Sequence, residues 1–113
     1  MTEINTIKSR VERTLSLVPS GKVVSYGQLA DFCGLPGRAR VMGKCLRLLD
    51  GHHNWHRVLR ADGKIAFPLG SDLAQVQGAR LLEEGVLVTN GRVSIKDYGW
   101  QPDLYTVLSK LEY

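Results

Sequence analysis

Residues 22–47 read KVVSYGQLADFCGLPGRARVMGKCLR and carry the pattern of two short helices joined by a tight turn. Ser25 followed three residues later by Gln28 is a capping box, which favours a helix that begins at this point and ends at Gly34. After a tight Pro-Gly connection, a further helix is expected over about residues 38–49. Two short helices joined by a glycine-containing turn predict a helix-turn-helix.

The second of these helices has two distinct faces. At about 100° per residue, three basic side chains fall within about 60° of one another: Arg40, Lys44 and Arg47. The opposite face is apolar and is expected to join the core through Val41, Met42, Cys45, Leu48 and Leu49. Gly43 lies at the edge of the basic face, where glycine costs about 1 kcal/mol relative to alanine. Either a partner comes close there or the glycine is merely tolerated.

Three more helices are expected along the chain. Apolar residues spaced three and four apart predict a helix over about residues 3–17, closed by Pro19. Ser71 can cap a helix over about residues 72–84 that Gly85 ends. A final apolar repeat after Pro102 predicts a last helix against the core, from Leu104, Val107, Leu108 and Leu111.

Two short hairpins complete the predicted fold. The first joins residues 58–59 to 65–67 across the turn Asp62-Gly63, and the second joins residues 86–88 to 93–95 across Asn90-Gly91. Asn-Gly is the dipeptide that favours a type I′ turn. We therefore expect a mainly α fold with small β hairpins, a winged helix-turn-helix.

Composition limits the class of protein. The 113 residues are 43% hydrophobic and 23% charged, and we expect residues 1–113 to form a single domain. No apolar run approaches the roughly 20 residues of a membrane-spanning helix, and the opening MTEINTIKSR lacks the apolar core of a signal peptide. Two cysteines need not form a disulfide framework, because a domain of this size can fold without one. These features predict a cytoplasmic protein with reduced thiols and no membrane contact.

The positive charge is concentrated in one segment. Residues 38–64 hold seven Lys and Arg against two acidic residues, whereas the rest of the chain holds eight against nine. The whole excess of the net +4 therefore lies in this segment. Such a local basic footprint favours a polyanionic partner, nucleic acid first, over the alternative of a solvated basic face.

Other chemistries have little support in the sequence. His52, His53 and His56 with Cys45 could suggest zinc, but no Cys-x-x-Cys or His-x-x-x-His spacing is present, so we expect neither metal nor cofactor. Cys45 lies on the apolar helix face and Cys33 near a helix end, where buried, inert thiols are usual.

Four motifs in order carry a family resemblance. They are KVVSYGQLA (22–30), ARVMGKCLR (39–47), NWHRV (54–58) and LLEEG (81–85). Together they resemble the DNA-binding and active-site domain of the O6-alkylguanine-DNA alkyltransferases over residues 22–85. The combination is specific, although no single motif is.

One departure changes the expected activity. In the enzymes the acceptor motif reads Pro-Cys-His-Arg-Val, and its thiolate takes the alkyl group in one irreversible displacement, whereas this chain has Trp55 in place of the cysteine. An indole neither ionises nor is activated by a neighbouring base at neutral pH, so the transfer step is expected to be lost. A tryptophan here resembles the alkyltransferase-like proteins, which bind alkylated guanine and hand it to nucleotide excision repair. We therefore expect no enzyme activity.

The resemblance also implies how the helix-turn-helix meets DNA. Tyr26 matches the tyrosine that helps rotate the damaged nucleotide out of the duplex, and Arg40 matches the arginine that fills the vacancy. The family places its helix in the minor groove, which accounts for the small residues Ala39 and Gly43. Contacts to the DNA backbone are expected from nearby basic residues: Lys44, Arg47, Arg57, Arg60 and Lys64.

The same resemblance implies a lesion pocket. A flipped purine offers a π-face, so Trp55 is expected to line the pocket, the alternative being a core tryptophan without ligand contact. His56 and Glu84 match the pair that activates the thiolate in the enzymes, and here they are expected to be structural remnants. Arg57 is expected to bond backbone carbonyls or Glu84. Residues 65–71 depart from the enzymes' pocket wall, which leaves the pocket shape open.

The expected function is a non-enzymatic sensor of O6-alkylguanine in duplex DNA. It would act as a monomer and flag the lesion to nucleotide excision repair proteins, near the nucleoid in a bacterium or in the nucleus in a eukaryote. One alternative is a residual transfer or hydrolytic enzyme that uses Cys45 with His56 and Glu84. Another is a winged-helix transcription regulator, which requires affinity for a specific undamaged sequence.

Overall fold

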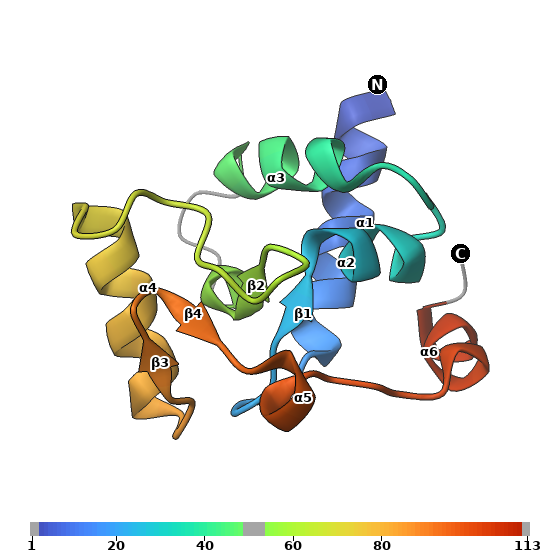
Figure 1. The fold of residues 1–113 in the computed structure, drawn as a ribbon. Coiled ribbons are helices and arrows are strands. Elements are labelled where there is room, and N and C mark those ends of the chain that lie inside the picture. Colours follow the sequence, from blue (N-terminus) through green and yellow to red (C-terminus); the bar gives the residue numbers. More distant parts are fainter. Residues whose placement is uncertain (1–2, 49–53, 112–113) are drawn as a thin grey trace.

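The computed structural model describes residues 3–48 and 54–111, and these form a mainly helical fold (Figure 1). The helices are α1 (Glu3–Leu17), α2 (Tyr26–Phe32), α3 (Ala39–Leu48), α4 (Asp72–Glu83), α5 (Ile95–Tyr98) and α6 (Leu104–Leu111), with a 3₁₀ turn η1 (Trp55–Arg57). The strands are β1 (Val24–Ser25), β2 (Val58–Leu59), β3 (Val88–Thr89) and β4 (Arg92–Val93). Leu49, His52 and His53, named above, lie outside the described residues.

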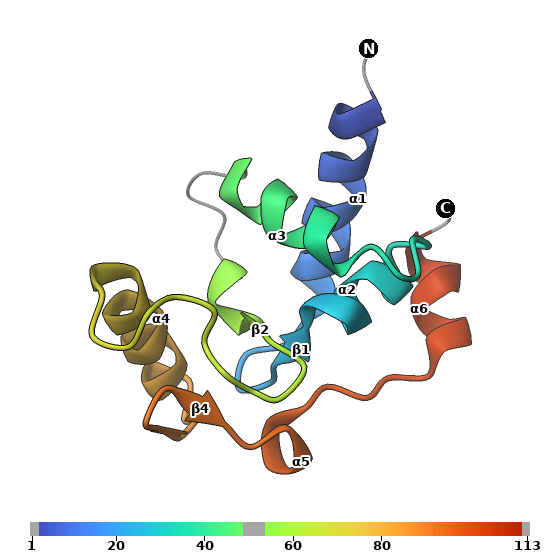
Figure 2. The same cartoon turned by 45° about the horizontal axis from the view of Figure 1, so that its top comes forward.

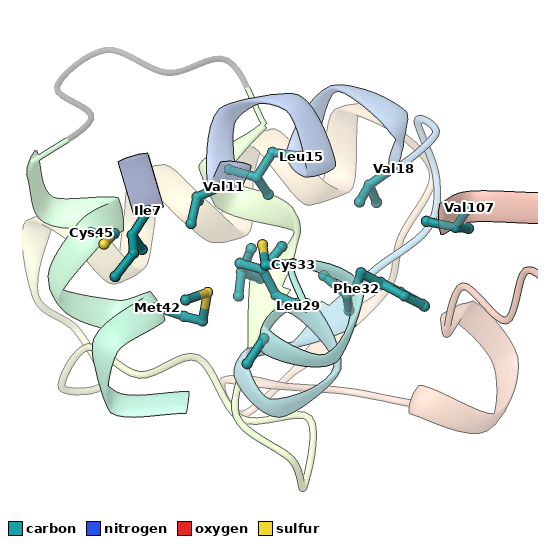
Figure 3. Close-up of a cluster of buried hydrophobic side chains, with 13 residues drawn as sticks. Ile7, Val11, Leu15, Val18, Leu29, Phe32, Cys33, Met42, Cys45 and Val107 are labelled. Carbon is teal, nitrogen blue, oxygen red and sulfur yellow. The ribbon is translucent and has the colours of Figure 1, made fainter. Parts of the chain in front are cut away.

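The chain packs around two neighbouring hydrophobic clusters. The helical core is built by α1, α2, α3 and α6 and includes Leu15, Leu29 and Met42, all fully buried. Figure 3 shows side chains from these helices converging, with Val107 of α6 at one end. The wing core lies under α4 and the β3–β4 hairpin and includes Leu81 and other residues: Val23, Leu59, Ile65, Val86 and Val93. In Figures 1 and 2, β1 and β2 stand between these two parts.

The expected helix-turn-helix is present, and its first helix is capped as the sequence indicates. The Ser25 hydroxyl accepts a hydrogen bond from the Gln28 amide at 3.0 Å, and Gly34 follows α2 with a φ of +76°. The described contacts do not include the reciprocal bond of a capping box, from the Ser25 amide to the Gln28 side chain; Nε2 of Gln28 donates to the Trp100 carbonyl. This contact ties the start of α2 to the segment that leads into α6.

The amphipathic pattern of α3 is confirmed. Met42 and Cys45 are fully buried in the helical core, while Arg40, Lys44 and Arg47 are exposed. The helix packs on α1 and α2, so its basic face is directed outward. The apolar spacing therefore positions three cations on one solvent-facing strip.

The second predicted hairpin is confirmed, and its turn has the expected chemistry. Val88 pairs with Val93 and Thr89 with Arg92 in an antiparallel ladder. Asn90 and Gly91 have φ values of +52° and +73°, as a type I′ turn requires.

The first predicted hairpin is wrong, although its turn exists. The Gly63 amide donates to the Arg60 carbonyl at 2.8 Å, but β2 does not pair with residues 65–67. Instead β2 pairs in parallel with β1, and the Ile65 amide donates to the Gly91 carbonyl at 2.9 Å. The reason is burial on both faces of β2, since Val58 enters the helical core and Leu59 the wing core.

The ranges of α1 and α4 agree with the prediction, and α6 follows Pro102 as expected. The helix α5 was not predicted: Ile95 was expected in the second hairpin, but the Ser94 hydroxyl accepts a hydrogen bond from the Asp97 amide at 3.2 Å and caps a short helix that begins at Ile95. Ser71 caps α4 by accepting a hydrogen bond from the Ala74 amide at 3.3 Å, and the helix ends before Gly85. No helix in the described part of the chain combines the length and apolarity that crossing a membrane requires.

Candidate nucleic-acid interface

A cavity of about 870 Å³ opens between the helix-turn-helix and the segment that leads into α4. One wall comes from α2 and α3 and contains six predicted DNA-contacting residues: Tyr26, Ala39, Arg40, Gly43, Lys44 and Arg47. The facing wall comes from η1, the following loop and the first turn of α4: Trp55, Ala66, Phe67 and Leu73. The cavity thus combines a basic wall with an aromatic and aliphatic one.

The basic wall leaves room at Gly43. A Cβ atom built on Gly43 would meet Cε1 of Tyr26 at 3.8 Å, which is an ordinary van der Waals contact. Packing inside the protein therefore does not require glycine at this position. Burial raises the pKa of the Tyr26 hydroxyl, and the positive charge of Arg47 opposes this rise less strongly. Tyr26 is therefore a neutral phenol at physiological pH.

Trp55 is half-buried and forms part of the facing wall. Its ring meets Phe67 edge-on, with centroids 6.1 Å apart and an interplanar angle of 81°. The His56 ring lies at a similar angle of 88°, with centroids 6.4 Å apart. These contacts place an indole, not a thiol, at the cavity.

Glu84 is the centre of a charged network beside η1. Its carboxylate accepts hydrogen bonds from Nη2 of Arg57 at 2.6 Å and from the Gly21 amide at 3.0 Å, and it lies 2.7 Å from Nε2 of His56. Burial alone raises the pKa of this carboxyl, but the hydrogen bonds from Arg57, Gly21 and His56 outweigh burial and lower the pKa to about 2. Glu84 is therefore ionised wherever the protein is folded near neutral pH.

Arg57 binds both Glu84 and a backbone carbonyl, the two kinds of partner expected from the sequence. Its Nε and Nη2 bind Glu84, and its Nη1 donates to the Val18 carbonyl at 2.8 Å. The side chain thereby connects η1 to the end of α1 as well as to α4. His56, Arg57 and Glu84 are absent from the described lining of the cavity; they hold the segment that carries Trp55.

Two side chains that anchor the segment around η1 were not predicted from the sequence. Nε2 of the buried Gln77 donates to the carbonyls of His56 and Val58, each at 3.0 Å. Nδ2 of Asn54 donates to the Leu15 carbonyl at 2.8 Å. The available signal was the place of Gln77 in the apolar stripe of α4, where a buried amide must find partners. Phe67 and Arg80 were also missed as neighbours of Trp55, and Leu73 as part of the cavity wall.

Neither cysteine faces this cavity. Cys33 and Cys45 are buried in the helical core (Figure 3), and burial raises the pKa of both thiols. Raised pKa values disfavour the nucleophilic thiolate. Among the described residues, no group of three or more His, Cys, Asp or Glu side chains gathers as a metal site would require.

Comparisons with known proteins identify the family. Residues 6–86 match the family model described as 6-O-methylguanine DNA methyltransferase, DNA binding domain. The DNA base-flipping protein of Vibrio parahaemolyticus is 41% identical over 88 residues, which cover 75% of this chain and 86% of that protein. Alkyltransferase-like protein 1 of Schizosaccharomyces pombe is 35% identical over 92 residues, covering 75% of this chain and 85% of that one.

Solved structures agree with this assignment. The crystal structure of Schizosaccharomyces pombe Atl1 in complex with damaged DNA containing O6-carboxymethylguanine superimposes with a TM-score of 0.77 at 32% identity, covering 90% of this chain and 100% of that one. Mycobacterium tuberculosis OGT in complex with DNA matches with a TM-score of 0.57 at 32% identity, over 74% of this chain and 50% of that one. The winged helix-turn-helix prediction is thereby confirmed. The chain belongs to the O6-methylguanine DNA methyltransferase family and is an alkyltransferase-like member of it.

Proposed function

We propose that this protein binds O6-alkylated guanine in duplex DNA, turns the damaged nucleotide out of the helix and leaves the alkyl group in place. The observation that carries the proposal is Trp55, which stands in the cavity wall at the acceptor position of the transfer enzymes. The relatives support DNA as the partner, since one is named a base-flipping protein and another is bound to damaged DNA.

The basic face of α3 supplies the contact with the duplex. Lys44 and Arg47 are exposed beside the cavity and can meet phosphate oxygens, which gives affinity for any sequence. Arg40 enters the base stack in place of the extruded nucleotide, and Tyr26 crowds the neighbouring phosphate. Ala39 and the open side of Gly43 allow the helix backbone to approach the minor groove closely.

The facing wall receives the extruded base. Extrusion costs a few kcal/mol of stacking and pairing, which contacts inside the cavity must offset. Stacking of a base on an aromatic side chain contributes about 1–3 kcal/mol. Trp55 offers such a surface, and Phe67 lies against it with its centroid 6.1 Å away.

Alkyl transfer lacks a nucleophile in this arrangement. The Trp55 indole cannot take the place of a thiolate, and the thiols of Cys33 and Cys45 are buried in the helical core. The pair His56 and Glu84 therefore has no thiol to activate. Together with Arg57 it holds η1 in place, which is a structural role.

We propose that the DNA complex, formed by a monomer, is then passed to nucleotide excision repair proteins. The compartment follows from the partner, so the protein acts at the nucleoid of a bacterium or in the nucleus of a eukaryote. Because the flipped base keeps its alkyl group, the lesion still needs excision by other proteins.

The fate of a labelled alkyl group tests the proposal. A duplex with O6-methylguanine that carries a labelled methyl group is incubated with excess protein, and the protein and DNA are then separated. All label should stay on the DNA as O6-methylguanine. Label bound to protein, or released as free alcohol or base, would show an enzyme instead.

Two variants test the recognition residues. Tyr26→Ala and Arg40→Ala should weaken binding to the damaged duplex more than binding to the matching undamaged duplex, because both act on the flipped state. A transcription regulator behaves differently: Arg40→Ala would then change the preferred sequence of undamaged DNA and leave lesion preference untouched.

A further inference from the structure

The indole of Trp55 is in contact with a cation that the proposed function does not use. The Cζ atom of Arg80 lies 5.6 Å from the centroid of the Trp55 ring, over its face. A guanidinium within about 6 Å of an indole centroid is attracted by the ring quadrupole. Arg80 is exposed and is absent from the described lining of the cavity, so it touches the wall and not the space inside.

The helical turn that carries Arg80 is held against η1 by Gln77 in α4 and by Glu84, the residue that caps the end of α4. Gln77, one turn earlier, donates to the His56 and Val58 carbonyls at 3.0 Å. Glu84, one turn later, lies 2.7 Å from His56 and accepts from Arg57. Residues three and seven positions apart share one side of a helix, so the same side of α4 that binds η1 presents Arg80 to Trp55.

No acidic group in the described part of the chain forms an ion pair with Arg80. Its guanidinium is planar and more weakly hydrated than an ammonium group, which suits it to stacking on an aromatic face. No carboxylate in the described part of the chain therefore draws the Arg80 guanidinium away from the Trp55 ring. Phe67 meets the same indole edge-on, so the ring is restrained from two elements, the loop and α4.

We propose that Arg80 is a positioning residue of the lesion pocket, whose guanidinium holds the Trp55 ring as the wall on which an extruded base stacks. The inference rests on the proposed function. A ring that is already fixed loses less conformational freedom when the base arrives, which strengthens binding. A cation–π contact at an exposed site corresponds to about a two- to fivefold change in affinity. An undamaged base that stays in the duplex gains nothing from the contact.

The test compares two substitutions of Arg80 with a matched loss of charge elsewhere. Dissociation constants are measured for an O6-methylguanine duplex and the same duplex with guanine, using Arg80→Gln, Arg80→Lys and, as the control, Lys96→Gln on the exposed face of α5. Arg80→Gln should lower the preference for the lesion about two- to fivefold, Arg80→Lys should restore part of it, and Lys96→Gln should leave it unchanged. Equal weakening toward both duplexes would instead mark a phosphate contact and overturn the proposal.

A second readout needs no DNA. The protein has two tryptophans, Trp55 and Trp100, so the indole N–H resonances of both can be followed by NMR and assigned with Trp55→Phe. Arg80→Gln should shift the Trp55 resonance and leave that of Trp100 in place. An unmoved Trp55 resonance would overturn the contact. If the unsubstituted protein showed no lesion preference, the proposed function would fail, whereas a preference that Arg80→Gln leaves intact would overturn the role of Arg80 alone.

Discussion

Replacement of Glu84 by glutamine should destabilise the protein strongly, in a way that depends on pH. The carboxylate is 14% exposed, receives hydrogen bonds from Arg57 and the Gly21 amide, and pairs with His56. In Glu84→Gln, Arg57 keeps its charge in a side chain that is only 12% exposed, and the partner that neutralised it is gone. Loss of one member of a buried pair typically costs about 3–5 kcal/mol.

The pKa of Glu84 gives a second value for the stability that its ionised carboxylate contributes. A pKa of about 2 in the folded protein against an ordinary value of 4.5 corresponds to about 3 kcal/mol of stability from the ionised carboxylate. The sign follows from proton binding: the folded state holds the proton more weakly than the unfolded state. This stability is therefore complete above about pH 5 and is lost as the pH falls from 4.5 toward 2.

Urea denaturation of wild type, Glu84→Gln and the control Glu83→Gln measures both effects. Glu83 is the exposed neighbour of Glu84, so its substitution removes the same charge without touching the network. At pH 7, Glu84→Gln should lower the free energy of unfolding by about 3 kcal/mol, and Glu83→Gln by less than about 0.5 kcal/mol. The difference between wild type and Glu84→Gln should shrink as the pH is lowered below 4.5. The prediction fails if Glu84→Gln is as stable as Glu83→Gln at pH 7. It also fails if the difference in unfolding free energy between wild type and Glu84→Gln does not change with pH.

Three further substitutions test the close packing at Gly63, the cap of α2 and the proposed phosphate contact of Lys44. Gly63→Ala should destabilise the protein by about 2 kcal/mol or more in thermal unfolding, because a Cβ there would lie 2.1 Å from the Val93 carbonyl oxygen at a φ of +87°; an unchanged Tm would contradict this. Ser25→Ala removes the hydroxyl that caps α2 and should cost about 1 kcal/mol in urea denaturation, whereas a loss too small to measure would mean that the cap is dispensable. Lys44→Gln should weaken binding to damaged and undamaged duplexes alike and reduce the slope of log K against log salt by about 0.9, and an unchanged slope would exclude a phosphate contact.

Local signals in the sequence were sufficient for most of the fold. The spacing of Ile7, Val11 and Leu15 predicts α1, and Asn90-Gly91 predicts the turn between β3 and β4, because each depends on residues close together in the chain. The partner of β2 could not be predicted in this way. Val58 and Leu59 are both apolar, and a strand buried on both faces gives no alternation that indicates which neighbour it joins.

The residues of the candidate site also fall into those that the sequence predicts and those that it does not. The basic wall follows from the periodicity of α3, since Arg40, Lys44 and Arg47 share one face of a single helix. Trp55 follows from its place in a four-part motif. Phe67 and Arg80 reach Trp55 from a loop and from α4, so their contact depends on how distant segments pack, which a single sequence does not show.

The affinity of the unsubstituted protein for two duplexes that differ only in one methyl group tests lesion recognition most directly. Dissociation constants are measured at one salt concentration for a duplex with O6-methylguanine and for the same duplex with guanine. A guanine methylated at O6 pairs less stably than guanine and therefore costs less to extrude, so the proposed function predicts tighter binding to the methylated duplex, about fivefold for each 1 kcal/mol of extrusion cost saved. Equal dissociation constants for the two duplexes would contradict it.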